Sequence, residues 1–282
     1  MLKHLIGGAA ALALTTLGQA QAVNITLDLD LTRSSLNTDQ RAEVQQIFEV
    51  STAYWAASLL GYDNPASADV DPVTISMSII NIDGPGRIVG AAAPRDTFSF
   101  DENPSTVYTK SGTAVFDTAD IARLLRRDRL LNVAVHEIAH VMGWGTLFRQ
   151  NGLSNCTAGR GADATYSGAH AIAKYQEEFG RSDTPLLETS TRRSSTDCVH
   201  WDEDTFGYGD ETDLMDGFTG ADAALSDTSL YVFRDLGYKT LDSALDIDAF
   251  FARSTSEVPV PAAALLFVPA AAALARRRKR QR

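Results

Sequence analysis

Apolar and polar residues alternate in two segments near the start of the chain, and this pattern predicts β-strands at 23–31 and 72–84. Between them, residues 36–62 carry apolar side chains at helical spacing behind cap-type residues, which predicts one long helix. Segments rich in β-branched residues predict two or three further strands within 86–94 and 105–117. The first half of the chain therefore has the order strand, long helix, several strands.

The next predicted element is a helix with Asp128 as its N-cap. Gly143 and Gly145 can end this helix, because glycine tolerates the left-handed conformation at a helix C-terminus. Its apolar positions lie roughly on one side and are Leu131, Val135, Ile138 and Met142.

The rest of the chain has fewer strand signals. Two helices are predicted, at 166–180 and at 225–238, the second of them capped by Ser226 or Asp227. No linker separates the two halves, so we expect one α+β domain with a twisted mixed sheet. Its expected bounds are 23–257, with an upper half at 23–145 and a mostly irregular and helical lower half at 146–257.

Both ends of the chain have the composition of processing segments. Residues 1–22 place Lys3 before an apolar run that ends in Ala20-Gln21-Ala22, which predicts a secretory signal peptide. A buried first helix is the alternative interpretation of this run.

Residues 258–282 combine a Val-Pro-Val-Pro motif, an apolar stretch and a basic tail. The apolar part is marginal for a membrane-spanning helix, which needs about 17–25 residues, and the basic tail favours the cytoplasmic side. The segment resembles the PEP-CTERM and VPLPA-CTERM sorting signals of Gram-negative bacteria. The resemblance implies transfer through the inner membrane, an exosortase-type partner enzyme and a cell-surface or extracellular destination. A plain tail anchor is the alternative.

Charge narrows the choice of partners. Without the two terminal segments, 18 basic and 36 acidic residues remain, a net charge of −18. Such a body repels nucleic acid, which we therefore exclude as a partner. It could hold Ca²⁺, but the acidic run 202–227 lacks the spacing of a calcium-binding loop, so the sequence does not support a calcium site.

The chain contains two cysteines, Cys156 and Cys198. In an exported protein such a pair predicts one disulfide, which would constrain a loop of about 43 residues. Two thiols, or two thiolate metal ligands, are the alternatives.

The stretch 136–140 reads His-Glu-Ile-Ala-His, which matches the H-E-x-x-H pattern of zinc hydrolases. Residues four apart share a helix face, so His136 and His140 can bind one ion while Glu137 can reach a bound water. A catalytic zinc takes three protein ligands and keeps one position for water. The motif therefore requires a third donor.

The third donor is not fixed by local spacing. The extended metzincin pattern puts a histidine three residues after Gly143, but that position is Thr146, a poor zinc ligand. The candidate histidines are His170, inside a helical alanine-rich run that favours a surface or packing role, and His200. Met215 follows His200 by fifteen residues in a turn-like segment, as the Met-turn methionine of metzincins follows their third ligand.

These motifs resemble the leishmanolysin branch of the metzincins, in which a long insertion separates the H-E-x-x-H-x-x-G motif from the third histidine. The resemblance covers about 85–240. It is carried by His200-Trp201-Asp202-Glu203, by Asp213-Leu214-Met215-Asp216-Gly217, and by similar segments at 86–94, 166–188 and 225–238. A cysteine-switch pro-segment has no counterpart, since no cysteine lies between 23 and 155, which leaves latency open.

The resemblance implies a secreted zinc endopeptidase with one Zn²⁺ on His136, His140 and His200. Glu137 would be the general base, Met215 a hydrophobic floor beneath the metal, and proteins or peptides the substrates. Substrate would bind as an extended strand along the sheet edge, expected near 105–111.

Asp202 or Glu203 could orient a metal-bound imidazole through a hydrogen bond, although such residues more often face water. Two other functions stay open. One is a non-catalytic surface or matrix protein that keeps a metzincin fold as a binding module. The other is a zinc hydrolase that acts on a non-peptide bond.

Overall fold

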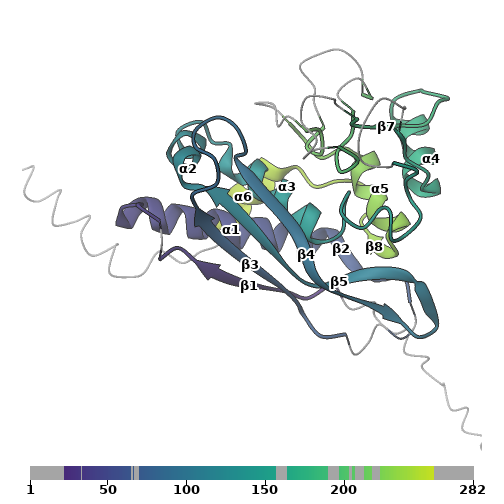
Figure 1. The fold of residues 1–282 in the computed structure, drawn as a ribbon, viewed down its shortest axis with the longest axis horizontal. Helices are drawn as coiled ribbons and strands as arrows, with labels where there is room; N and C mark the ends of the chain where they lie inside the picture. The colour runs from purple at the N-terminus through teal and green to yellow at the C-terminus, as the bar shows by residue number, and fades with distance from the viewer. Residues whose placement is uncertain are drawn as a thin grey trace, which may run out of the picture.

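The computed structural model describes residues 22–32, 34–64, 66, 70–156, 164–189, 197–202, 205–206, 213–217 and 223–256 (Figure 1). The predicted signal peptide, apart from residue 22, and the predicted sorting segment 258–282 lie outside these residues. None of the helices within the described ranges is both long and apolar enough to cross a membrane.

A four-stranded mixed sheet forms the first half of the structure, in the order β1-β3-β5-β4. β1 and β5 are both parallel to β3, whereas β4 is antiparallel to β5 and forms one edge of the sheet. The strands are β1 (Ile25–Asp30), β3 (Val73–Ile80), β4 (Gly90–Phe100) and β5 (Asn103–Asp117). With the helices described below, this mixed sheet confirms the α+β class.

The sheet order corrects one prediction. Residues 105–111 were expected at the sheet edge, but they lie within β5, which is an inner strand in the sheet order. β4 and β5 form a long hairpin, so β4 covers one side of this segment through pairs such as Thr97 with Thr109, whereas β3 pairs with β5 only from Ser111 onward. The edge strands of the sheet are β1 and β4.

The long helix α1 (Thr38–Ser58) begins at a capping box, in which Asn37 Oδ1 accepts from the Gln40 N–H and the Gln40 side chain accepts from the Asn37 N–H. Its buried face packs on the sheet, and Phe48 stacks on Phe116 of β5 at 4.6 Å between ring centroids. The helix ends earlier than the predicted residue 62. Leu59–Tyr62 form a strand, β2, because they pair with β8 (Tyr238–Thr240).

Two consecutive helices, α2 (Thr118–Leu125) and α3 (Leu130–Val141), follow the sheet. Asp117 caps α2 by accepting from the Ala119 N–H. The predicted N-cap of α3 was wrong: Arg129 occupies that position, and Asp128 adopts a left-handed φ of 54° in the turn that reverses the chain between the two helices. The local sequence signalled a helix start but not the tight turn before it.

The helices α1, α3 and α6 (Ile247–Ser256) lie together on one side of the sheet (Figure 1). α3 packs against α1, β4 and β5. The buried Trp55 of α1 fixes this packing, because its Nε1 donates to the Val135 carbonyl of α3 at 2.8 Å. α3 is therefore enclosed by protein along its length, and eleven of its twelve residues are buried.

In the second half, α4 (Ala169–Glu178) and α5 (Asp227–Asp235) pack side by side and cap each other. Asp235 accepts from the N–H groups of His170 and Ala171, and Glu178 accepts from the N–H groups of Asp227 and Thr228. α4 is shorter than the predicted 166–180, since β6 (Ala164–Thr165) pairs with β7 (Leu186–Leu187) just before it.

The predicted cap of α5 is confirmed at Ser226, whose Oγ accepts from the Ser229 N–H. One continuous hydrophobic core joins both halves and runs from Val23 to Ile247. The two halves therefore pack as one body around the helix that carries the H-E-x-x-H motif.

Candidate metal centre

The chain turns sharply after α3 because two glycines adopt left-handed conformations. Gly143 has a φ of 111° and ends the helix as predicted, directly after the C-cap Met142, while Gly145, with a φ of 71°, lies in the turn that follows. A side chain on Gly145 would overlap the backbone of Val199, which lies beside it. This close approach brings the segment before His200 against the end of α3.

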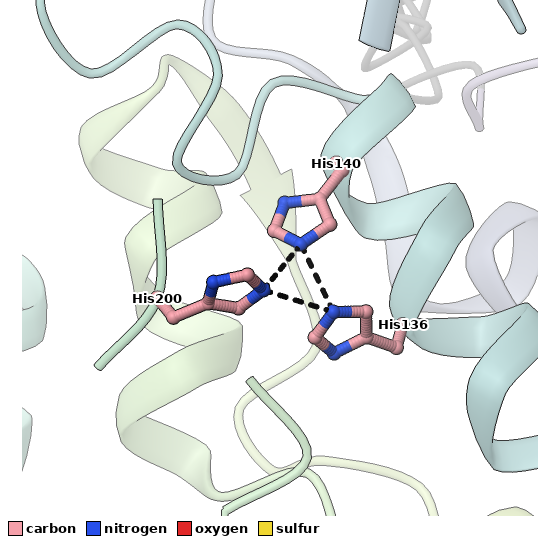
Figure 2. Close-up of side chains that lie close together, drawn as sticks. All are labelled: His136, His140 and His200. Atoms are coloured by element: carbon pink, nitrogen blue, oxygen red, sulfur yellow. Dashed lines mark hydrogen bonds between the residues drawn. The ribbon is translucent and has the colours of Figure 1, made fainter. Parts of the chain in front are cut away.

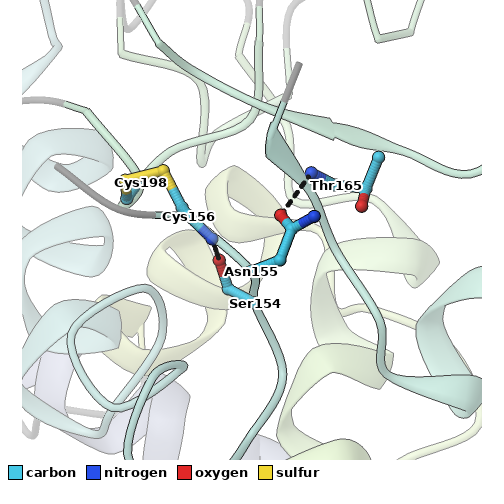
Figure 3. The surroundings of a disulfide bond; sticks show 5 residues. All are labelled: Ser154, Asn155, Cys156, Thr165 and Cys198. Atoms are coloured by element: carbon cyan, nitrogen blue, oxygen red, sulfur yellow. Dashed lines mark hydrogen bonds between the residues drawn. A yellow bond between two sulfur atoms is a disulfide. The ribbon is translucent and has the colours of Figure 1, made fainter. Parts of the chain in front are cut away.

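A disulfide and a short ladder hold the same segment from the other side. Cys156 and Cys198 are bonded, with their Cα atoms 5.7 Å apart, which confirms the predicted pairing (Figure 3). The Cys198 N–H donates to the Glu188 carbonyl at 2.8 Å, and the Glu188 N–H donates to the His200 carbonyl at 2.9 Å. The backbone from which the His200 side chain projects is therefore held on both sides.

The structure brings three predicted histidines together. The Nε2 atoms of His136, His140 and His200 lie 3.0–3.1 Å from one another and point toward a common centre (Figure 2). All three side chains are buried. The other candidate, His170, lies exposed on α4, and Thr146 bonds through its hydroxyl to the His140 carbonyl.

Two backbone carbonyls decide which ring nitrogens carry protons. His136 Nδ1 lies 2.6 Å from the Leu214 carbonyl, and His140 Nδ1 lies 2.9 Å from the Trp144 carbonyl. A carbonyl can only accept, so each Nδ1 carries the proton and each Nε2 presents a lone pair to the centre. Facing lone pairs repel each other unless a cation lies between them.

Burial also favours neutral imidazoles. Desolvation lowers the pKa of His136 to about 4, although the Leu214 carbonyl opposes this shift. Desolvation lowers the pKa of His140 well below its usual value, and the neighbouring rings of His136 and His200 add to the effect. Metal ions bind the neutral imidazole, so this buried group of three histidines could bind a metal ion.

Glu137 lies between the two helix histidines in sequence and is also buried. Its carboxylate lies against the start of the edge strand: a Cβ added to Gly90 would come within 2.5 Å of Glu137 Oε1. Burial raises the pKa of the Glu137 carboxyl to about 8. The structure thus places a buried acid, one residue after His136 in α3, next to the first residue of β4.

Met215 is fully buried in a tight turn closed by a hydrogen bond from the Asp216 N–H to the Asp213 carbonyl. The Met215 carbonyl accepts from the Trp201 N–H at 3.1 Å. The turn therefore connects directly to the residue after His200, and its Leu214 carbonyl holds His136.

Sequence reasoning missed the groups that orient the imidazoles. Two of them are backbone carbonyls, of Leu214 and Trp144. Every residue has a backbone carbonyl, so the sequence does not indicate which ones bond to a histidine. Glu188 also lies near His200: one oxygen of its buried carboxylate is 3.9 Å from His200 Nδ1, which is too far for a hydrogen bond. Glu203, a candidate for this task, lies outside the described residues, and the Asp202 backbone N–H donates to the Leu186 carbonyl.

Comparison with known proteins assigns the chain to no family: no protein-family model matches it, and a search of curated proteins finds no significant match.

Proposed function

We propose that this protein is a secreted or cell-surface zinc metalloendopeptidase with a metzincin-like, leishmanolysin-type catalytic domain. The observation that carries the proposal is the convergence of the three buried Nε2 atoms of His136, His140 and His200. The donor set comes from one helix and from a segment sixty residues away, so a general helix-packing requirement does not account for it.

Zinc suits these donors better than most metals that proteins bind. Three neutral imidazoles favour zinc, copper, iron or nickel over the oxygen-preferring Mg²⁺ and Ca²⁺. Three protein ligands, with a fourth position for water, are the ligand count of catalytic zinc sites, whereas structural zinc sites have four protein ligands. Within the residues that the structure describes, the group of potential metal ligands has three members, His136, His140 and His200.

Zinc held by these histidines would polarise a scissile carbonyl and lower the pKa of a bound water toward about 7. Glu137 would take the proton from that water and pass it to the leaving amine, so that two peptides are formed. Glu137 follows His136 directly in α3, and the proposal requires its carboxylate to reach the water on that ion.

The substrate class follows from the sheet edge. β4 is an outer strand, and its first residue, Gly90, lies against Glu137. An extended peptide could pair with Gly90–Ala93 and place a peptide bond near the histidines. Pro94 and the register shifts that follow it would limit regular pairing to this first part of the strand.

Export supports the same proposal. The disulfide is typical of an oxidising compartment, as the predicted signal peptide at 1–22 requires. The segment 258–282 would then direct the protein to an exosortase-type enzyme at the inner membrane and on to the cell surface.

Casein or gelatin hydrolysis by the purified protein tests the proposal, with and without a chelator and beside Glu137→Ala. We expect hydrolysis that the chelator abolishes and zinc restores, and a loss of about 100-fold or more in the variant. A zinc-loaded native protein that cleaves neither substrate would favour the non-catalytic binding module. A panel of non-peptide substrates tests the remaining alternative, a zinc hydrolase that acts on a non-peptide bond.

A further inference from the structure

Ser229 of α5 is completely buried and forms hydrogen bonds with several other segments. Its Oγ donates to Asp213 Oδ1 and accepts from Trp201 Nε1, both at 2.7 Å. Its carbonyl accepts from Trp144 Nε1 at 3.2 Å. One small residue therefore bonds to three segments that are far apart in the sequence.

The first of these segments, around Asp213, contacts His136. Asp213 Oδ1 also accepts from the Met215 N–H at 2.7 Å, so this carboxylate closes the turn around Leu214. The Leu214 carbonyl is the acceptor for His136 Nδ1. The bond from Ser229 thus fixes the carboxylate that shapes the turn.

The other two segments, around Trp144 and Trp201, lie next to His140 and His200. The Trp144 carbonyl accepts from His140 Nδ1, and Trp201 is the residue directly after His200. The two indole rings meet edge to face, with centroids 5.1 Å apart, and both donate to Ser229. His140 is therefore one hydrogen bond from a partner of Ser229, His200 is one residue from another, and His136 bonds to the residue next to the third.

We propose that Ser229 is a positioning residue for the metal centre, which sets the relative placement of the three segments around Trp144, Trp201 and Asp213 that carry or contact the histidines. The inference rests on the proposed zinc site. Without the hydroxyl, the Trp201 N–H and one Asp213 oxygen would each lose a partner inside a dry core, where a lost bond is costly and the groups rearrange to recover it. A rearrangement at that point moves the segments that aim the imidazoles.

Thr228 provides a matched control in the same helix turn. It is completely buried, and both its N–H and its hydroxyl donate to Glu178 of α4. Its described bonds thus join α5 to α4 and include none of the three segments that Ser229 contacts around Trp144, Trp201 and Asp213. Thr228→Ala and Ser229→Ala each remove one buried hydroxyl, but only the second should alter the metal centre.

The test measures zinc affinity by competition with a chromogenic chelator and the visible absorption spectrum of the Co²⁺-substituted protein. Both are recorded well below the unfolding temperature of each variant. We expect Ser229→Ala to weaken zinc binding about tenfold and to change the Co²⁺ spectrum. Thr228→Ala should lower the unfolding temperature while leaving both metal readouts as in the native protein.

Zinc binding and a Co²⁺ spectrum in Ser229→Ala that match those of Thr228→Ala would overturn the positioning role and leave the peptidase proposal intact. A native protein that binds no zinc would overturn both. If Ser229→Ala does not fold, Trp201→Phe removes the N–H that Ser229 accepts and tests the same contact. Unchanged zinc affinity in that variant would contradict the inference.

Discussion

His136 Nε2 lies 3.1 Å from His200 Nε2, although 64 positions separate the two residues in the chain. Three independent constraints produce this approach: the left-handed turn after α3, the Cys156–Cys198 disulfide, and the backbone ladder between Glu188 and the segment before His200. The turn after α3 can be tested by substitution at its glycines.

The close approach at Gly145 predicts that Gly145→Ala weakens metal binding as well as stability. The new methyl group would meet the left-handed strain, at about 1 kcal/mol, and would also overlap Val199. Zinc affinity and the free energy of unfolding measure the two effects separately. We expect at least a tenfold loss of zinc affinity.

Gly152→Ala is the control for strain alone. Gly152 has a similar φ of 68°, but nothing lies within 4 Å of an added Cβ. It should lose stability only, by about 1 kcal/mol. Equal zinc affinities in the two variants would show that the contact between Gly145 and Val199 does not position His200.

The contact between Gly90 and Glu137 predicts a variant that keeps its metal and loses activity. In Gly90→Ala the added methyl group would lie 2.5 Å from Glu137 Oε1, so the carboxylate must move. We expect peptidase turnover to fall about 100-fold, the scale of general-base catalysis, with zinc content unchanged. Ala91→Ser, an exposed change on the same strand, should leave both unchanged. Normal turnover in Gly90→Ala would argue against Glu137 as the base in this position.

Asp117 predicts a pH dependence of stability away from the metal centre. Desolvation of this buried carboxyl would raise its pKa, but backbone N–H groups from Ala119, Asp83, Gly84 and Ile82 donate to it and lower the pKa below the usual value of 3.8. A lowered folded-state pKa stabilises the fold above the unfolded pKa, and this contribution is lost as the pH falls through the folded pKa.

Urea denaturation of the native protein and Asp117→Asn, both metal-free, measures this contribution. At pH 7 we expect the variant to be about 2 kcal/mol less stable, since it replaces charged hydrogen bonds with weaker ones. The difference should shrink as the pH is lowered below about 4. A constant difference from pH 7 down to pH 2 would mean that the charge of Asp117 contributes nothing.

The sequence predicted the parts of the fold that depend on local pattern. The strands around 25–30 and 73–80, and the helix with His136 and His140, follow from periodicity and capping. Prediction was wrong where tertiary pairing decides: Leu59–Tyr62 continue the helical pattern but pair with β8, and β4 pairs along one side of β5, so that β4 and not β5 is the outer strand. Asp128 was misassigned because the pattern does not show a left-handed turn.

The candidate site was predictable because the chain contains few histidines. The choice between His170 and His200 required only sequence context, and the structure places His170 on an exposed helix face. The orientation of the rings was not predictable. It depends on the carbonyls of Leu214 and Trp144, and on a serine in α5 whose role is visible only when the three segments are packed together.

Zinc content of the native protein, His200→Ala and His170→Ala tests the central claim most directly. His200 is the proposed ligand that the fold brings from a distant part of the chain, whereas His170 is an exposed histidine of the same half of the chain. We predict about one zinc per chain in the native protein and in His170→Ala, and a loss of zinc affinity of at least 100-fold in His200→Ala. A His200→Ala variant that binds zinc as tightly as the native protein would contradict the proposed metal centre.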